Sequence, residues 1–208
     1  MTLKEYIESE ILPQYDHFDT SHQRDHALKV IEESMRLARF YDVDLDMVYA
    51  IAAFHDTGLV EGRELHHLVS GQMVRKDVFL NRYFEASQVE IMAQAVEDHR
   101  ASSKHGPRSV YGRIVAEADR DIIPLKIIRR TVQYGLSHYP ALNKEGHWAR
   151  TVEHLDEKYA EGGYLKLYIP QSQNAERLEE LRAIIRDISR LRSVFEEIFA
   201  QEIKNLTN

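Results

Sequence analysis

The chain has 208 residues, 43% of them hydrophobic and 29% charged, which is typical of a globular protein with one domain, or with one domain and a helical extension. Its formal net charge of −7 argues against an extended nucleic-acid surface, because binding along a duplex needs a basic face. The absence of cysteine excludes disulfides and thiolate metal sites, and no apolar run approaches the roughly 20 residues of a membrane span, so we expect no membrane partner.

The first predicted helix spans about residues 2–11 and stops at Pro13. It carries Glu5, Glu8 and Glu10, whereas a secretory signal would be basic and then apolar. We therefore expect a cytoplasmic protein.

Apolar residues recur at helical spacing along most of the remaining chain, without strand-like alternation or internal repeats. We predict helices at 21–41, capped by Asp19, Thr20 or Ser21, and from Asp44 or Asp46 to Gly58. Further helices are predicted at 66–79, 86–99, 109–118, 125–137, 148–159 and 175–206, the last of which can contain a bend. A polar loop at 101–107 and a short extended segment at 164–169 separate some of them. The predicted fold class is all-α, with a compact bundle over 1–140 and a C-terminal helical extension over 141–208.

The pair His55-Asp56 ends a predicted helix whose preceding residues, 50–54, are all apolar. Burying a charged carboxylate is costly unless it is paired or bound to a metal. Adjacent helical residues point about 100° apart, but both side chains can reach one ion that lies beyond the helix end. The alternative is an ordinary helix end, in which His55 interacts with the helix dipole and Asp56 begins the turn before Gly58.

Two residues outside the pair offer matching chemistry. His26 lies near the apolar side of the predicted helix 21–41, and Asp119 follows the apolar end of the helix 109–118. Alone, His26 would be an ordinary core or surface histidine, and Asp119 an ordinary helix-end acid. Together with the pair they supply two imidazoles and two carboxylates from three helices. This mixture suits Mn, Fe, Zn, Ni or Mg and not a soft metal.

The order of these residues resembles the H…HD…D signature of the HD-domain superfamily. His26 begins His-Ala-Leu-Lys-Val, with lysine where the family usually has arginine. The pair lies in Ala-Ala-Phe-His-Asp-Thr-Gly, and Asp119 lies in Glu-Ala-Asp-Arg, with Glu117 where the family has aspartate. The resemblance covers about residues 21–123 and implies an HD-type helical bundle. It also implies that one divalent metal is held by four ligands: His26, His55, Asp56 and Asp119.

Some members of that superfamily hold a second metal through additional histidines, and two segments here are similar to theirs. His66-His67 precedes Ser70-Gly71, as in the family's His-x-x-x-Gly, a spacing that selects His67. His99 ends a predicted helix before Arg100, as in the family's helix that ends in His-Arg. His67 and His99 are therefore candidates for a second metal or for the substrate phosphate, with helix capping as the alternative. Which of His66 and His67 faces the site is left open.

A basic loop follows His99 in an otherwise acidic chain. Arginine presents a planar fork that matches phosphate oxygens, so we expect Arg100 and Arg108 to bind a small phosphorylated substrate. Lys104 and His105 are interpreted as solvated loop residues. Glu61 and Glu64 follow the pair and are candidates for an acid or base.

The resemblance predicts metal-dependent hydrolysis of a phosphate ester or anhydride, in a nucleotide or another small phosphorylated metabolite. The same scaffold allows two alternatives: a sensor that binds a phosphorylated ligand without hydrolysis, and a di-iron oxygenase. The apolar residues of 175–206 need a partner, which is either the rest of the chain or a second subunit in a homo-oligomer.

Overall fold

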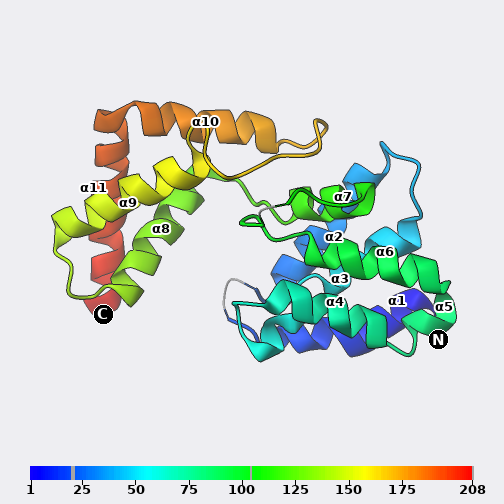
Figure 1. Ribbon diagram of the computed structural model, residues 1–208. Helices are drawn as coiled ribbons and strands as arrows, with labels where there is room; N and C mark the ends of the chain where they lie inside the picture. The colour runs from blue at the N-terminus through cyan, green and yellow to red at the C-terminus, as the bar shows by residue number, and fades with distance from the viewer. Residues whose placement is uncertain (20–21, 104, 208) are drawn as a thin grey trace. The chain divides into compact units, whose positions relative to one another are not determined.

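The computed structural model describes residues 1–19, 22–103 and 105–207 (Figure 1). Every regular element in those ranges is helical, which confirms the all-α prediction. Contacts divide the chain into two units. Unit 1 comprises Met1–Arg120 and Leu167–Ser172, and unit 2 comprises Asp121–Lys166 and Gln173–Asn208. The predicted boundary near residue 140 differs from this division, because α8 (Pro124–His138) packs on helices of unit 2.

Unit 1 begins with α1 (Leu3–Tyr6), which continues as a π-helix (Ile7–Ile11) and a 3-10 helix (Leu12–His17). Pro13 does not end the helical run as predicted, because it lies in the first turn of the 3-10 helix, where its missing N–H is not needed. The other helices of the unit are α2 (Arg24–Ala38), α3 (Leu45–Phe54), a second 3-10 helix (Thr57–Glu61), α4 (His66–Lys76), α5 (Leu80–Tyr83), α6 (Ala86–Glu97) and α7 (Val110–Ala118).

Side-chain caps explain where two of these helices start. Asp44 accepts hydrogen bonds from the backbone N–H groups at the start of α3, and Ser109 does the same for α7. Two of the caps predicted for α2, Thr20 and Ser21, lie outside the described residues, and Gln23 occupies the N-cap position of the observed helix.

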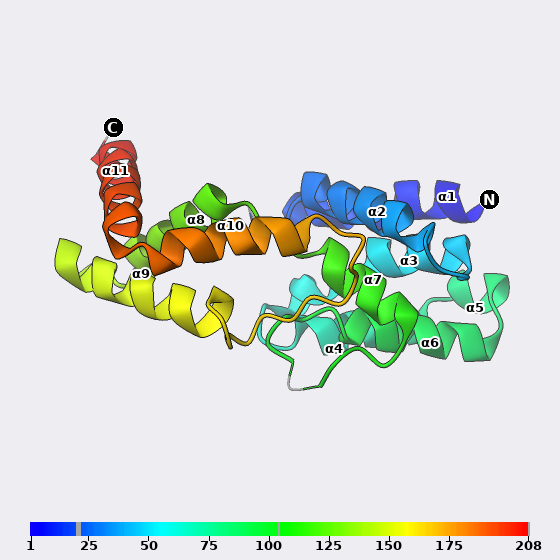
Figure 2. The same cartoon turned by 90° about the horizontal axis from the view of Figure 1, so that it is seen from above.

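The core of unit 1 is built around α3, whose residues 50–54 are all buried. This helix contacts α2, α6 and α7, and α4 packs on α6 and on the second 3-10 helix (Figures 1 and 2). A helix that is apolar on nearly all sides has to be enclosed by others. The two residues that follow it, His55 and Asp56, therefore lie inside the unit.

Unit 2 contains α8, α9 (Lys144–Tyr159), α10 (Asn174–Arg186) and α11 (Ile188–Thr207), which contact one another. The predicted helix 175–206 is broken at Asp187, where the backbone leaves the helical region. The segment 164–169, predicted to be extended, pairs with no strand among the described residues. None of the helices in the described chain is long and apolar enough to cross a membrane.

Candidate metal centre

The turn after α3 presents His55 and Asp56, which are only 0% and 3% exposed. Side chains satisfy the last carbonyls of the helix: His55 Nδ1 bonds Ala52 O (2.7 Å), Tyr15 Oη donates to Ala53 O (2.8 Å) and Thr57 Oγ1 donates to Phe54 O (2.8 Å). The backbone N–H of Asp56 donates to the Tyr15 hydroxyl oxygen (3.2 Å). These bonds hold the helix end, whose carbonyls would otherwise lack partners, and with it the pair.

Gly58 allows α4 to pack closely against this turn. A Cβ atom on Gly58 would lie 2.2 Å from the carbonyl oxygen of His66 and 2.6 Å from the backbone nitrogen of Ser70. Ser70 Oγ also accepts a hydrogen bond from the Gly58 N–H (2.8 Å). Any larger residue would separate α4 from the turn that carries Asp56.

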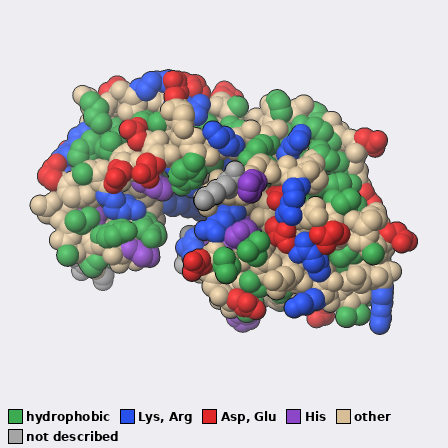
Figure 3. Space-filling view, viewed as in Figure 1, with side chains coloured by type: hydrophobic (Ala, Val, Ile, Leu, Met, Phe, Trp, Pro, Cys, Tyr) green, Lys and Arg blue, Asp and Glu red, His purple; other side chains and the backbone are tan. Residues whose placement is uncertain are grey.

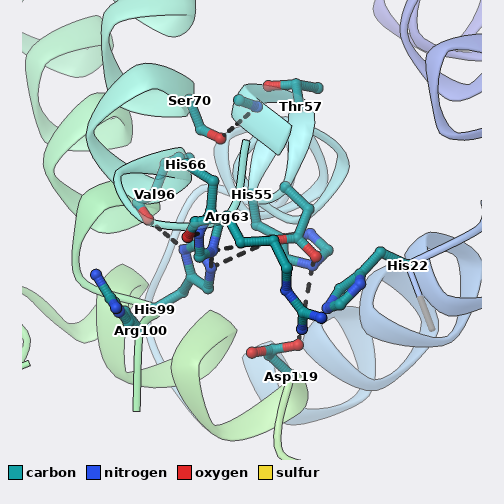
Figure 4. A network of polar contacts seen from close by, with 12 residues as sticks. His22, His55, Thr57, Arg63, His66, Ser70, Val96, His99, Arg100 and Asp119 are labelled. Carbon is teal, nitrogen blue, oxygen red and sulfur yellow. Dashed lines mark hydrogen bonds and ion pairs between the residues drawn. The ribbon is translucent and has the colours of Figure 1, made fainter. Parts of the chain in front are cut away.

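Three histidines share one orientation. In His55, His66 and His99, Nδ1 bonds the carbonyl oxygen three residues earlier, at 2.7, 2.7 and 2.6 Å respectively. A carbonyl oxygen can only accept, so each Nδ1 carries a proton, and in the neutral ring Nε2 is the nitrogen that presents a lone pair. Figure 4 shows His66 and His99 pointing toward each other from α4 and from the end of α6. Metal-binding histidines are commonly oriented by such a bond to a backbone carbonyl.

The four ligands implied by the resemblance converge in unit 1. His26 Nε2 lies 3.2 Å from His55 Nε2, 3.6 Å from Asp56 Oδ2 and 3.2 Å from Asp119 Oδ1. His55 Nε2 lies 3.2 Å from Asp56 Oδ2 and 3.9 Å from Asp119 Oδ1. His26, His55 and Asp56 are close enough to hold one metal ion, and Asp119 Oδ1 faces both imidazoles.

A second group of ligand atoms lies on the other side of Asp56. Its Oδ1 is 3.4 Å from His66 Nε2 and 3.4 Å from His99 Nε2, and these two nitrogens are 3.1 Å apart. Asp56, His66 and His99 are likewise close enough to hold an ion. Asp56 thus directs one oxygen to each group.

The geometry brings His66 into the cluster and not His67, which the family's spacing had selected. The two residues are consecutive in α4, so their side chains point about 100° apart. His66 Nε2 faces Asp56, whereas His67 Nδ1 is buried without a hydrogen-bond partner in the described structure. Burial, with a further contribution from Arg100, lowers the pKa of His67 to about 4.

The acids and imidazoles of the cluster shift one another's pKa values. Burial alone would raise the pKa of Asp56, but His55 and His99 outweigh it and hold that pKa well below its usual range. Burial alone would lower the pKa of His55, but the Asp56 carboxylate outweighs it, so this pKa is raised. Burial also opposes ionisation of Asp119, yet a hydrogen bond with His26 keeps its pKa low. Both carboxylates are therefore ionised and suited to a cation.

The basic residues near the cluster differ in what they contact. Arg100 is half-buried, donates from Nη1 to the carbonyl oxygen of Glu64 (2.6 Å), and lies near enough to lower the pKa of His67. Histidine side chains of unit 1 lie at the surface beside Lys and Arg side chains on the face shown in Figure 3. Of the two arginines predicted to bind phosphate, Arg100 is the one that lies near the histidines of α4, and its phosphate contact stays a prediction.

Arg108 has a different environment from the one predicted. It is exposed, and its guanidinium donates to the carboxylates of Asp98 (3.0 Å) and Glu97 (2.7 Å) and to the Gln94 carbonyl (2.9 Å). These contacts join the end of α6 to the following loop, so a phosphate contact by Arg108 is not supported. Lys104 lies outside the described residues.

The two candidate acids or bases are both exposed. The described contacts of Glu64 involve its backbone carbonyl, and none directs the side chain of Glu61 or Glu64 into the cluster. Their predicted roles therefore gain no support from the geometry. By contrast, sequence reasoning missed Tyr15, because it lies 41 residues before Asp56 in a segment without a motif.

Two comparisons with known proteins found similarities to this chain. The family model of the HD domain matches residues 24–121. Among solved structures, a predicted HD superfamily hydrolase from an uncultured Thermotogales bacterium is similar to this chain, with 23% sequence identity and a TM-score of 0.49. That similarity covers 74% of this chain and 90% of the other. None of the curated proteins compared with the chain matches it.

Proposed function

Because residues 24–121 match the HD-domain family, we propose that this chain is a metal-dependent phosphohydrolase acting on a nucleotide or another small phosphorylated metabolite. The observation that carries the proposal is the position of Asp56. Its two oxygens face two groups of imidazoles, at oxygen–nitrogen distances of 3.2 and 3.6 Å to one group and 3.4 Å to both nitrogens of the other. Such an arrangement suits a pair of metals that clamps both sides of a phosphoryl transfer.

The donor atoms indicate which metals fit. His26, His55, Asp56 and Asp119 would hold one ion, and Asp56, His66 and His99 a second. Four imidazoles favour Mn, Fe, Ni or Zn over Mg, which prefers oxygen ligands. When bound, such an ion neutralises phosphoryl oxygens and lowers the pKa of water.

The residues of the chain supply orientation and charge. The Nδ1 bonds of His55, His66 and His99 keep each Nε2 aimed at the cluster, so none of these three imidazoles has to reorient when a ligand arrives. Arg100 would pair with the phosphate through its planar fork, and the Glu64 carbonyl holds its guanidinium in place.

A second candidate function is a di-iron oxygenase on the same scaffold. The observation that favours it is the complete histidine set, since His66 and His99 accompany the four ligands of the first group. This function would require iron and molecular oxygen as co-reactant. Metal preference and oxygen consumption therefore distinguish it from hydrolysis.

The test uses the full chain, stripped of metal and reloaded separately with Mn²⁺, Fe²⁺ and Zn²⁺. Metal content and phosphate release are measured over a panel of nucleotides and sugar phosphates. Asp56→Asn should lower the metal content below one ion per chain and reduce phosphate release by at least about 100-fold. The control is His17→Gln, at an exposed histidine, which should change neither quantity.

Other outcomes decide against the proposal. Unchanged metal content and phosphate release in Asp56→Asn would contradict it. Oxygen consumption by the iron form without phosphate release would favour the oxygenase, and nucleotide binding without turnover would favour a sensor.

A further inference from the structure

Residues 167–172 belong to unit 1, although the match to the HD domain ends at residue 121. Buried backbone N–H groups need partners, and this segment has no strand to pair with in the described structure. Two of these N–H groups bond a single side chain, the carboxylate of Glu117 in α7. We call residues 167–172 the clasp segment.

Glu117 makes three hydrogen bonds to the clasp segment. Its Oε2 accepts from the backbone N–H of Tyr168 (2.7 Å) and of Ile169 (3.4 Å), and its Oε1 accepts from the Ser172 hydroxyl (2.5 Å). The side chain of Glu117 is completely buried. A buried carboxylate is tolerated only when such donors surround it, so its place in the fold depends on the clasp segment.

Further contacts fasten the clasp segment to unit 1. Ile169 is buried in a cluster with Leu37, Ala38, Val48 and Ile114. The carbonyl oxygen of Gln171 accepts a hydrogen bond from Arg36 Nη2 (3.4 Å), and its side-chain oxygen accepts one from the Tyr41 hydroxyl (3.1 Å). The segment is therefore held by α2 and by the loop after it as well as by α7.

The end of α7 connects these contacts to the metal centre. Asp119, two residues after Glu117, directs Oδ1 to His26 Nε2 at 3.2 Å. The next residue, Arg120, is 7% exposed, and its guanidinium lies over the ring of Tyr168, 5.1 Å from the centroid. Residues on both sides of Asp119 thus contact the clasp segment.

We propose that Glu117 is a positioning residue of the metal centre, which uses the clasp segment to fix the end of α7 and therefore the Asp119 carboxylate. The inference rests on metal binding as given in the proposed function. Functional groups in such sites have to be held within about 0.5 Å of their working positions, so a loosened helix end weakens metal binding. The metal centre then requires residues 167–172 in addition to the matched HD domain.

The side-chain length at position 117 provides the sharpest variant. This chain has glutamate where the family pattern has aspartate, and Glu117→Asp removes one methylene group. Shortening the side chain withdraws the carboxylate by about 1.5 Å, the length of one C–C bond, which is too far to keep all three bonds. Glu117→Gln keeps the length but replaces one accepting oxygen by a donor.

The experiment compares both variants with the wild type and with Glu202→Gln. Glu202 is a buried glutamate of α11 that bonds Arg129 and Gln133 within unit 2, so it is a matched control for stability. Mn²⁺ affinity of the full chains is measured by calorimetry at a temperature where circular dichroism shows all of them folded. Both Glu117 variants should bind Mn²⁺ about 10-fold more weakly, as for other residues that support metal ligands. Glu202→Gln should lower the melting temperature and leave Mn²⁺ affinity unchanged.

Amide hydrogen exchange gives a second measurement. The amides of Tyr168 and Ile169 should exchange faster in both Glu117 variants than in Glu202→Gln. If the Glu117 variants do not fold, Ser172→Ala removes one bond without changing α7 and should weaken Mn²⁺ binding about threefold.

The outcomes separate this inference from the proposed function. A wild type that binds Mn²⁺, with Glu117→Asp binding it equally well, overturns the positioning role and leaves the metal site intact. A wild type that binds none of the tested metals overturns the proposed function and this inference with it.

Discussion

Unit 1 and unit 2 each bury histidines, but in different surroundings. Burial would lower the pKa of His55 in unit 1, yet the Asp56 carboxylate outweighs it and raises that pKa. In unit 2, His147 of α9 is 2% exposed, and burial together with the nearby Arg150 lowers its pKa. Its ring lies against Phe199, at 5.6 Å between centroids. Burial therefore does not distinguish a functional histidine, whereas convergence of Nε2 atoms on a shared carboxylate does.

The metal-binding capacity of the described residues follows the same division. Both groups of side chains that could hold an ion lie in unit 1, and Asp56 is common to them. Unit 2 stabilises itself with aromatic contacts and ion pairs instead, such as Arg192 with Glu145 (2.5 Å) and with the ring of Trp148 (5.0 Å). The comparison predicts that substitutions in the two units affect different properties.

The largest expected effect comes from substituting, one at a time, the two neighbouring histidines of α4. His66→Gln removes an Nε2 that lies 3.4 Å from Asp56, so it should cost about one metal ion per chain and reduce phosphate release by about 100-fold. His67→Gln should leave the metal content unchanged and alter turnover less than about threefold. Elemental analysis and a phosphate-release assay measure both. The reverse ranking would mean that the family's spacing, and not the orientation found here, selects the ligand.

That pair of residues shows where sequence reasoning reached its limit. The proximity of four residues could be predicted, because each lies in a recognisable local context at the end or on the apolar side of a helix: His26, His55, Asp56 and Asp119. The choice between His66 and His67 depends on where α4 starts and on the bond from His66 Nδ1 to the Arg63 carbonyl. A spacing pattern in the sequence specifies neither the start of the helix nor this hydrogen bond.

Contacts between segments that are far apart in the sequence also could not be predicted. The all-α class followed from apolar periodicity. Tyr15 and Glu117 act across 41 and more than 50 residues of sequence, and no local pattern encodes such partners. The contacts of Arg108 with Glu97 and Asp98 at the end of α6 also became visible only in the structure, and its phosphate contact stays a prediction.

Tyr15→Phe tests whether the helix end beneath the metal centre matters. The change keeps the ring but leaves the Ala53 carbonyl and the Asp56 N–H without the hydroxyl, which should cost about 1–3 kcal/mol of unfolding free energy. Urea unfolding of the metal-free chain measures this loss. Tyr49→Phe, on α3 itself and only half-buried, is the control and should cost less than about 0.5 kcal/mol. Equal losses would show that the Tyr15 hydroxyl contributes nothing to holding Asp56.

The smallest expected effect is a pH dependence that arises in unit 2. His154 of α9 is half-buried, and burial, with Lys158 and Arg150 nearby, lowers its pKa to about 4. Its unfolded pKa is about 6.5, so the unfolded chain binds the proton more tightly than the folded chain. The contribution of His154 to stability is therefore constant above about pH 7 and declines as the pH falls through 6.5 toward 4.

His154→Gln removes that proton-binding site and should flatten the decline in unfolding free energy between pH 7 and pH 4.5. We expect the difference to be on the order of 1 kcal/mol after allowing for solvent screening. Urea unfolding of the metal-free wild type and variant at several pH values measures it, and subtracting the two curves cancels the titration of unit 1. Parallel curves would show that His154 is protonated as easily in the folded chain as in the unfolded one. The contrast between the units would then rest on His147 alone, because burial would no longer be keeping the other α9 histidine neutral.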